Sequence, residues 1–186
     1  MNQPPNHLTT QPPNHPLFLI GLRGSGKSTV ARLLARQLGW DWLDADAELE
    51  KRYGWSIRGI FAAEGEAGFR EKESAILAQL CRLPRHVIAT GGGIVLREDN
   101  RELLRSSGRI VWLTADGETL WQRVQADRTT AERRPPLTIG GRAEMEEILH
   151  LREPLYRQCA DYVVNTAARE PNAIAAEILS WMGEKR

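Results

Sequence analysis

The sequence predicts an α/β fold in three layers, with a five-stranded parallel sheet between two layers of helices. Short apolar runs alternate with segments of helical apolar periodicity through the whole chain, and this alternation is typical of a parallel sheet covered on both faces. The chain of 186 residues suffices for one such domain with a sizeable core, which we expect over residues 16–186. The expected strands lie near residues 16–21, 40–44, 86–90, 109–113 and 161–165.

The first expected strand runs directly into residues 21–29, which read GLRGSGKST and match the G-x-x-x-x-G-K-S pattern of a phosphate-binding loop. A helical pattern follows and stops at Gly39, so the motif has the strand–loop–helix setting that it requires. Glycines let the backbone approach an anion, and the helix N-terminus attracts negative charge. Lys27 would then contact the β- and γ-phosphates, and Ser28 would ligate Mg²⁺. The alternative is a glycine-rich turn with a solvated lysine. In both cases we expect Lys27 to face solvent and to support no core.

Two further strands end in residues suited to a ligand site. Asp44 and Asp46 stand at the carboxyl end of the second strand, where open α/β sheets bind ligands. A bound triphosphate needs a metal ion and a nucleophile needs a base, and a carboxylate can serve either purpose. The alternative is that an aspartate here is a helix N-cap. Gly91, Gly92 and Gly93 follow the third strand. Three glycines are costly in chain entropy, so they indicate backbone N–H groups that face a ligand, with a tight turn as the alternative.

The segment after Asp46 is mainly helical and is interrupted by glycines, with helices expected over 47–53, 56–63 and 67–81. Within it, Arg70 and Glu73 are three residues apart, a spacing typical of a surface ion pair. The arginine-rich, proline-broken segment 127–140 lies between two helices and predicts a mobile lid, or else an exposed loop without a partner.

The helical pattern over 142–159 contains Pro154, which should kink the helix or start a second piece.

Composition sets limits on the class of protein. The net charge of +1 gives no support to nucleic-acid binding, and no apolar run has the length of a membrane span. Cys81 and Cys159 lack metal-ligand spacing and indicate reduced thiols in a cytoplasmic protein. Residues 1–15 are rich in Pro and Asn, have no secretory signal pattern, and predict a disordered tail.

Six spaced motifs together resemble the shikimate kinase family, a P-loop branch similar to the nucleoside monophosphate kinases. The similarity covers about residues 17–182. It implies a P-loop kinase fold with a substrate-binding helical segment at about 45–75 and a mobile lid at about 127–140. The motifs are residues 21–29, Asp44-x-Asp46, Gly68-Phe69-Arg70-x-x-Glu73, Gly91-Gly92-Gly93, Arg134-Pro135 and Arg152-x-Pro154-Leu155-Tyr156.

The resemblance also implies roles for individual residues. Asp46, Lys27 and Arg134 would be catalytic, with Asp46 as the favoured general base. Ser28, and Asp44 through water, would hold Mg²⁺. The nucleotide would be bound by Gly24, Ser25, Gly26, Lys27, Ser28, Thr29, Arg128 and Arg134. The substrate would be bound by Asp46, Arg70, Gly91, Gly92, Gly93 and Arg152, with the two arginines on its carboxylate.

The implied reaction moves the γ-phosphoryl group of ATP to the 3-hydroxyl of shikimate, a step of aromatic amino acid biosynthesis. The implied partners are ATP and shikimate, with no nucleic acid and no membrane, and the implied state is a monomer. The alternatives are another small-metabolite kinase, such as a gluconate kinase, and a non-catalytic nucleotide-binding module. No N-K-x-D motif supports a GTPase.

Three positions depart from the family pattern. The lid is about one residue shorter than expected between Arg128 and Arg134, and Pro136 stands where the family usually has leucine. Arg133 therefore competes with Arg134 for the phosphate contact. Arg23 lies inside the phosphate loop, either against the nucleotide or toward solvent.

Overall fold

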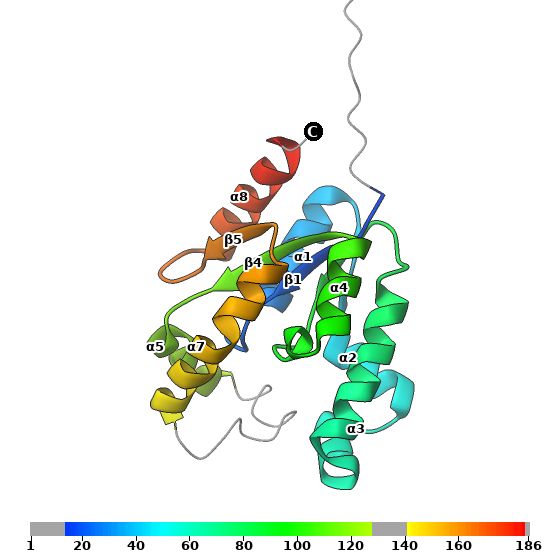
Figure 1. Ribbon diagram of the computed structural model, residues 1–186. Helices are drawn as coiled ribbons and strands as arrows, with labels where there is room; N and C mark the ends of the chain where they lie inside the picture. Colours follow the sequence, from blue (N-terminus) through cyan, green and yellow to red (C-terminus); the bar gives the residue numbers. More distant parts are fainter. Residues whose placement is uncertain (1–13, 128–140, 185–186) are drawn as a thin grey trace, which may run out of the picture.

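The computed structural model describes residues 14–127 and 141–184. Its centre is a five-stranded parallel sheet, as the sequence predicts, and Figure 1 labels its strands β1, β4 and β5. The strand order, which the sequence analysis did not predict, is β2-β3-β1-β4-β5. The expected strand positions are confirmed to within one or two residues. The strands are β1 (Leu17–Ile20), β2 (Asp41–Asp44), β3 (His86–Ala89), β4 (Arg109–Thr114) and β5 (Tyr162–Asn165).

The helices lie where the periodicity places them. The expected division into helices over 56–63 and 67–81 is confirmed, because non-helical backbone at Gly65 (φ 69°, ψ −170°) separates two helical pieces that share the label α3. Helix α7 continues across Pro154, so the proline does not start a second helix, which was one of the two outcomes expected there. The helices are α1 (Lys27–Leu38), α2 (Ala45–Tyr53), α3 (Ile57–Leu80), the 3₁₀ turn η1 (Ile94–Leu96), α4 (Glu98–Ser107), α5 (Gly117–Ala126), α7 (Gly141–Cys159) and α8 (Pro171–Glu184).

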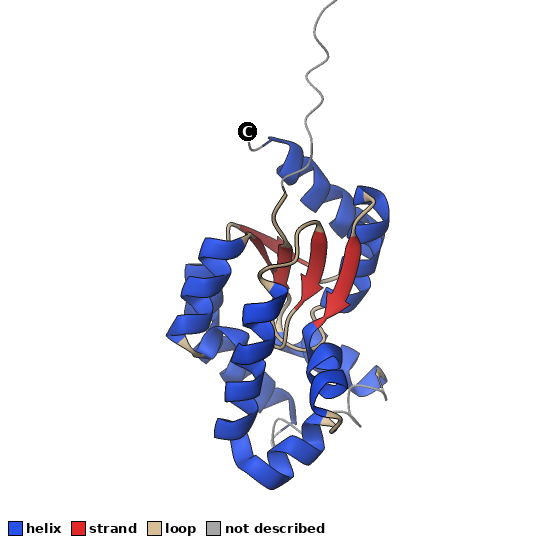
Figure 2. Cartoon of the chain, turned by 90° about the vertical axis from the view of Figure 1, so that its right-hand side faces the viewer, coloured by secondary structure: helices blue, strands red, loops and turns tan. Residues whose placement is uncertain are grey.

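Both faces of the sheet are buried, because alternate residues of each strand enter different cores. In β1, Leu17 and Leu19 pack in a cluster with residues of α1 and α8, whereas Phe18 and Ile20 pack in a cluster with residues of α2, α3, α4, α5 and α7. Figure 2 shows the helices on both sides of the strands. The predicted three-layer architecture is therefore confirmed, and it explains why the central strand β1 is apolar and buried along its whole length.

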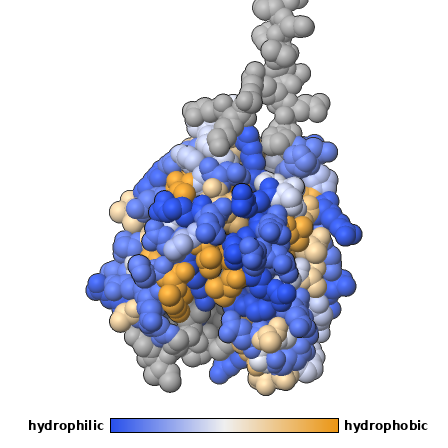
Figure 3. All heavy atoms as spheres, in the orientation of Figure 1, coloured by the Kyte–Doolittle hydropathy of each residue, from blue (hydrophilic) through white to orange (hydrophobic). Residues whose placement is uncertain are grey.

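On the face drawn in Figure 3, hydrophilic residues cover most of the surface and hydrophobic residues gather in small areas near the centre. Within the described ranges, no helix is long and apolar enough to cross a membrane.

Strand register brings three segments to one edge of the sheet. Ala89 of β3 is level with Leu19 of β1 on one side and with Asp44 of β2 on the other. The segments that follow these strands therefore leave the sheet side by side: the phosphate loop, the start of α2 and the glycine turn. In open α/β sheets, ligands bind at this carboxyl edge.

Candidate active site

The loop over residues 21–26 has the conformation that its glycines predict. Gly24 and Gly26 have φ angles of 82° and 88°, a region that side chains other than glycine rarely adopt. At Gly24 a Cβ atom would also lie 2.7 Å from the carbonyl oxygen of Leu120. The loop then feeds into α1 at Lys27, so backbone N–H groups gather at a helix N-terminus.

Lys27 does not face solvent, and that expectation is wrong. Its side chain is buried, and its ammonium donates to the carbonyl oxygens of Gly21 (2.8 Å) and Leu22 (2.7 Å) and to Oγ of Ser25 (3.3 Å). The tight turn directs these oxygens inward, so the ammonium satisfies acceptors that burial removes from water. Lys27 therefore supports the loop that it belongs to.

Asp44 serves as the helix N-cap that was one of its two interpretations. Its Oδ1 accepts hydrogen bonds from the backbone N–H groups of Asp46 (3.0 Å) and Ala47 (3.3 Å), which caps α2. Its Oδ2 accepts a hydrogen bond of 2.7 Å from the Ser28 hydroxyl. The same carboxylate thus caps the N-terminus of α2 and bonds Ser28, so the two side chains predicted to hold a metal lie together.

A cleft of about 550 Å³ opens beside the loop and the end of β2. Most predicted nucleotide, metal and base residues line it, whereas Arg70, Arg152, Ser25, Gly91 and Gly93 lie outside its lining. The predicted residues in the lining are Gly24, Gly26, Lys27, Ser28, Thr29, Asp44, Asp46 and Gly92, and Arg23 also lines it.

Sequence reasoning missed several other residues of the cleft, namely Arg32, Trp42, Thr90 and Arg123. Arg123 of α5 donates to the carbonyl oxygen of Gly24 (3.3 Å) and to the hydroxyl (3.0 Å) and carbonyl oxygen (2.7 Å) of Thr166. It thereby ties the phosphate loop to the segment after β5. The sequence carries no signal for this contact, since its three residues belong to no shared motif.

The glycine turn is held by α7 on one side. The Arg152 guanidinium donates to the Gly92 carbonyl oxygen (3.2 Å), and the Tyr156 hydroxyl donates to the same oxygen. Tyr156 is buried and stacks on Trp112 of β4 with ring centroids 5.6 Å apart, so its hydroxyl is firmly placed. The Ile94 N–H donates to the Gly91 carbonyl oxygen (3.2 Å), and the Leu96 N–H donates to the Gly93 carbonyl oxygen (3.0 Å). The glycines therefore form the tight turn that was one of their two interpretations.

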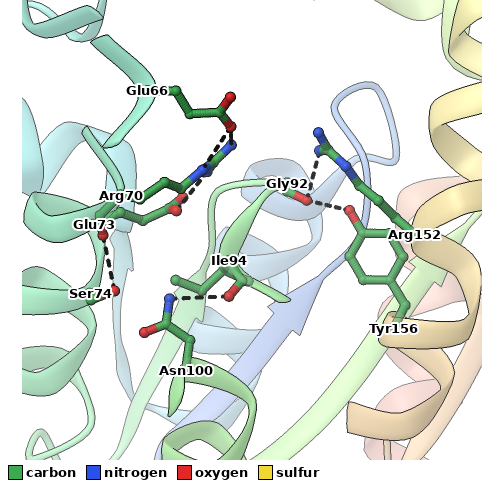
Figure 4. Close-up of polar contacts among 9 residues, drawn as sticks. All are labelled: Glu66, Arg70, Glu73, Ser74, Gly92, Ile94, Asn100, Arg152 and Tyr156. Carbon is green, nitrogen blue, oxygen red and sulfur yellow. Dashed lines mark hydrogen bonds and ion pairs between the residues drawn. The ribbon is translucent and has the colours of Figure 1, made fainter. Parts of the chain in front are cut away.

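Arg70 of α3 reaches the turn from the opposite side. A Cβ atom at Gly93 would lie 2.2 Å from Nη1 of Arg70 and 2.5 Å from its Cζ, so the guanidinium occupies the space above this glycine. Figure 4 shows Arg70 and Arg152 approaching the turn from opposite sides. The two arginines predicted for the substrate carboxylate are therefore brought to neighbouring glycines.

Arg70 and Glu73 do not form the surface pair that their spacing indicates. Nη1 of Arg70 lies 2.7 Å from Oε2 of Glu73, and the side chains are only 14% and 4% exposed. The pair is buried because α3 packs this face toward the core, a tertiary feature that the i, i+3 spacing alone does not carry.

Part of the prediction lies outside the described residues. This holds for Arg128, Arg133 and Arg134, for all of the expected lid except Asp127, and for residues 1–13 of the expected tail.

The thiols show no sign of reactivity. Burial raises the pKa of Cys159 to about 11, and burial also raises the pKa of Cys81. Residues 14–127 and 141–184 contain no cluster of three or more His, Cys, Asp or Glu side chains arranged to hold a metal.

With this geometry in hand, comparison with known proteins identifies the family. A family model described as shikimate kinase matches residues 23–183. The chain belongs to the shikimate kinase family. It is 46% identical over 168 residues to a shikimate kinase of Rhodopirellula baltica, covering 90% of this chain and 89% of that protein. It is 45% identical over 170 residues to a shikimate kinase of Pseudomonas syringae pv. tomato, covering 90% and 96%.

A solved structure shows the same fold. Shikimate kinase from Acinetobacter baumannii in complex with shikimate superposes with a TM-score of 0.86 at 35% identity, covering 94% of this chain and 97% of that one. The predicted P-loop kinase fold and the predicted family are thus confirmed, and the chain is an ATP-dependent kinase by family.

Proposed function

We propose that this member of the shikimate kinase family transfers the γ-phosphoryl group of ATP to the 3-hydroxyl of shikimate, giving shikimate 3-phosphate and ADP. The observation that carries the proposal is the convergence of Arg70 and Arg152 on the glycine turn beside a phosphate-loop cleft. A kinase for an uncharged acceptor has no use for two guanidinium groups there.

The carboxylate of shikimate would lie between the two arginines. A guanidinium is planar, always charged and matches a carboxylate with paired hydrogen bonds, which a lysine does not reproduce. Gly91, Gly92 and Gly93 would bind the ring hydroxyls through backbone groups. Asp46, which lines the cleft, would accept a hydrogen bond from the reacting hydroxyl.

ATP would place its phosphates on the N–H groups of residues 24–29. The Lys27 ammonium, now bonded to loop oxygens, would turn to the β- and γ-phosphates. Arg128 would lie against adenine and Arg134 would reach the transferring group, roles that rest on the family resemblance.

Mg²⁺ fits the donors present. The Ser28 hydroxyl and the Asp44 carboxylate lie together and supply oxygen atoms, which Mg²⁺ prefers, and a site with few protein ligands suits an ion that keeps water and phosphate oxygens. Ser28 would bind the ion directly and Asp44 through water. When bound, the ion neutralises phosphate charge.

In the proposed reaction the 3-hydroxyl oxygen forms a bond to the γ-phosphorus while its proton passes to Asp46. The bond from that phosphorus to the β–γ bridging oxygen breaks, and its electron pair leaves with ADP. Positioning and charge neutralisation supply most of the rate acceleration in phosphoryl transfer, and the protein forms no covalent bond to the phosphoryl group. Lys27 and Arg134 would therefore contribute most of the acceleration. Asp46 orients and deprotonates the nucleophile.

A coupled assay of ADP release tests this proposal. ATP and Mg²⁺ are supplied with shikimate, with gluconate, or with neither. Saturable ADP release that depends on shikimate and is lost in Asp46→Asn is expected. ADP release with gluconate but not with shikimate would indicate a gluconate kinase. If ATP binds but neither acceptor causes ADP release, a non-catalytic nucleotide-binding module would be favoured.

We also propose that the protein acts as a monomer in the cytoplasm, as the resemblance implies. Light scattering on the purified protein tests the first part, and a mass near twice 20.9 kDa would refute it. Cell fractionation tests the second.

A further inference from the structure

Two carboxylates already hold the guanidinium of Arg70. Oε1 of Glu66 accepts from Nε (3.2 Å) and Nη2 (3.0 Å), and Oε2 of Glu73 accepts from Nη1 (2.7 Å). Figure 4 shows Glu66 and Glu73 around the guanidinium that faces the glycine turn. Glu66 therefore occupies one edge of the same group that is proposed to grip the substrate carboxylate.

The two carboxylates differ in their freedom to move. Glu73 is 4% exposed, so leaving Arg70 would strand a buried charge. Glu66 is 64% exposed, so it can turn into water at little cost. If one of the two is replaced when a ligand arrives, it is Glu66.

Charge balance indicates that one must be replaced. With Glu66 and Glu73 in place, Arg70 already faces two negative charges. A shikimate carboxylate would be a third, and Arg152 would compensate only one of them. Exchanging Glu66 for the substrate keeps the charge around Arg70 constant.

We propose that Glu66 is an internal carboxylate that occupies Arg70 until the carboxylate of shikimate displaces it, so that shikimate affinity is lowered by the strength of this ion pair. The proposal rests on the function proposed above. In this proposal Glu66 is a positioning residue that holds the Arg70 guanidinium over Gly93 when no substrate is bound. The Glu66–Arg70 ion pair then competes with substrate binding, and only an acceptor with a carboxylate displaces it.

The chain geometry supports this role. The break at Gly65 starts the second part of α3, which places Glu66 in its first turn and four residues before Arg70. An acid four residues before a base is the favoured order for a helical pair. The Glu66–Arg70 pair therefore forms readily without a ligand. Because Glu66 is exposed to solvent, its carboxylate can rotate into water when a ligand replaces it.

The test measures ADP release while shikimate is varied at saturating ATP, in wild type, Glu66→Gln and Glu66→Asp. Gln removes the charge, and Asp keeps the charge but shortens the side chain. Both variants should lower KM for shikimate about two- to fivefold, the range of an exposed ion pair, and leave KM for ATP unchanged. Calorimetric titration of shikimate should show the same change in Kd.

Glu64→Gln is the matched control. Glu64 lies two residues away on α3 and pairs with Lys72 instead of Arg70, so this variant makes the same change of charge without touching the contact. Its KM for shikimate should equal that of wild type. An equal decrease in Glu64→Gln would mean that general charge, not displacement, sets the affinity.

An unchanged or higher KM for shikimate in the Glu66 variants would overturn the proposal, since Glu66 would then help Arg70 to bind. If wild type turns over shikimate and the variants bind it no better, only this proposal fails. If wild type gives no shikimate-dependent ADP release, the proposed function fails and this inference falls with it.

Discussion

Replacing Gly93 by Ala should separate substrate recognition from folding. The backbone at Gly93 has φ −97° and ψ 1°, a conformation open to alanine, so the main chain need not move. The new Cβ, however, would lie 2.2 Å from Nη1 of Arg70 and 2.5 Å from Cζ and Nη2. An ordinary contact needs at least 3.4 Å, so the guanidinium must retreat by about 1 Å.

The retreat sets the size of the effect. A guanidinium displaced by about 1 Å loses a charged hydrogen bond to the substrate, which is worth about 1.5–3 kcal/mol. KM for shikimate should therefore rise about ten- to hundredfold, since each 1.4 kcal/mol is a factor of ten. KM for ATP should stay near the wild-type value, because the loop over residues 21–29 is untouched.

The assay is coupled ADP release with shikimate and ATP varied in turn, together with thermal unfolding. Gly183→Ala is the control, because a Cβ at this position meets no atom within 4 Å. It should leave both KM values unchanged. A normal KM for shikimate in Gly93→Ala would refute the reasoning, since Arg70 would then bind substrate from another position or not at all.

Three further predictions concern the loop, a helix cap and a thiol. Lys27→Ala should lower turnover at least about 100-fold and, because its ammonium bonds the loop carbonyl oxygens, should also lower Tm by about 2–4 °C; near-normal turnover would remove the phosphate-loop role. Asp116→Ala should cost about 1 kcal/mol in unfolding free energy at pH 7, measured by urea titration. Hydrogen bonds from Thr119 lower the pKa of Asp116, so this stability is present above the unfolded pKa of about 4 and is lost as pH falls through the folded value. A mutant deficit that persists undiminished at pH 2 would contradict the assignment. Cys159 should resist iodoacetamide at pH 8 in the folded protein and react in urea, because burial holds its pKa at about 11. Equal labelling in both states, read by peptide mass spectrometry, would show that the site is open.

The features that the sequence predicted correctly are local ones. Strands such as β1 and β3 are short apolar runs, and helix ends such as Gly39 and Asp116 are fixed by backbone conformation and side-chain caps within a few residues. Such signals do not depend on what packs nearby. They sufficed for the fold class, and the spaced motifs sufficed for the family.

The errors and omissions have a common cause in tertiary packing. The burial of Glu73 depends on which face of α3 meets the core, and the inward turn of Lys27 depends on carbonyl groups that only the folded loop presents. Arg123 contacts Gly24 and Thr166, which are 99 and 43 residues away in sequence. Residue types alone do not indicate such contacts.

The site is built from groups that already have partners inside the protein. The Lys27 ammonium bonds loop oxygens, and the Ser28 hydroxyl bonds Asp44. The Arg70 guanidinium bonds Glu66 and Glu73. Each contact keeps a polar group satisfied and in place. In the proposed function, the bonds of Lys27 and Ser28 and the Glu66 bond of Arg70 are exchanged when ATP, Mg²⁺ or shikimate binds, whereas the buried Glu73 stays on Arg70. Affinity for these ligands is therefore a difference between two sets of bonds, so removing an internal partner can strengthen binding while removing the group itself weakens it.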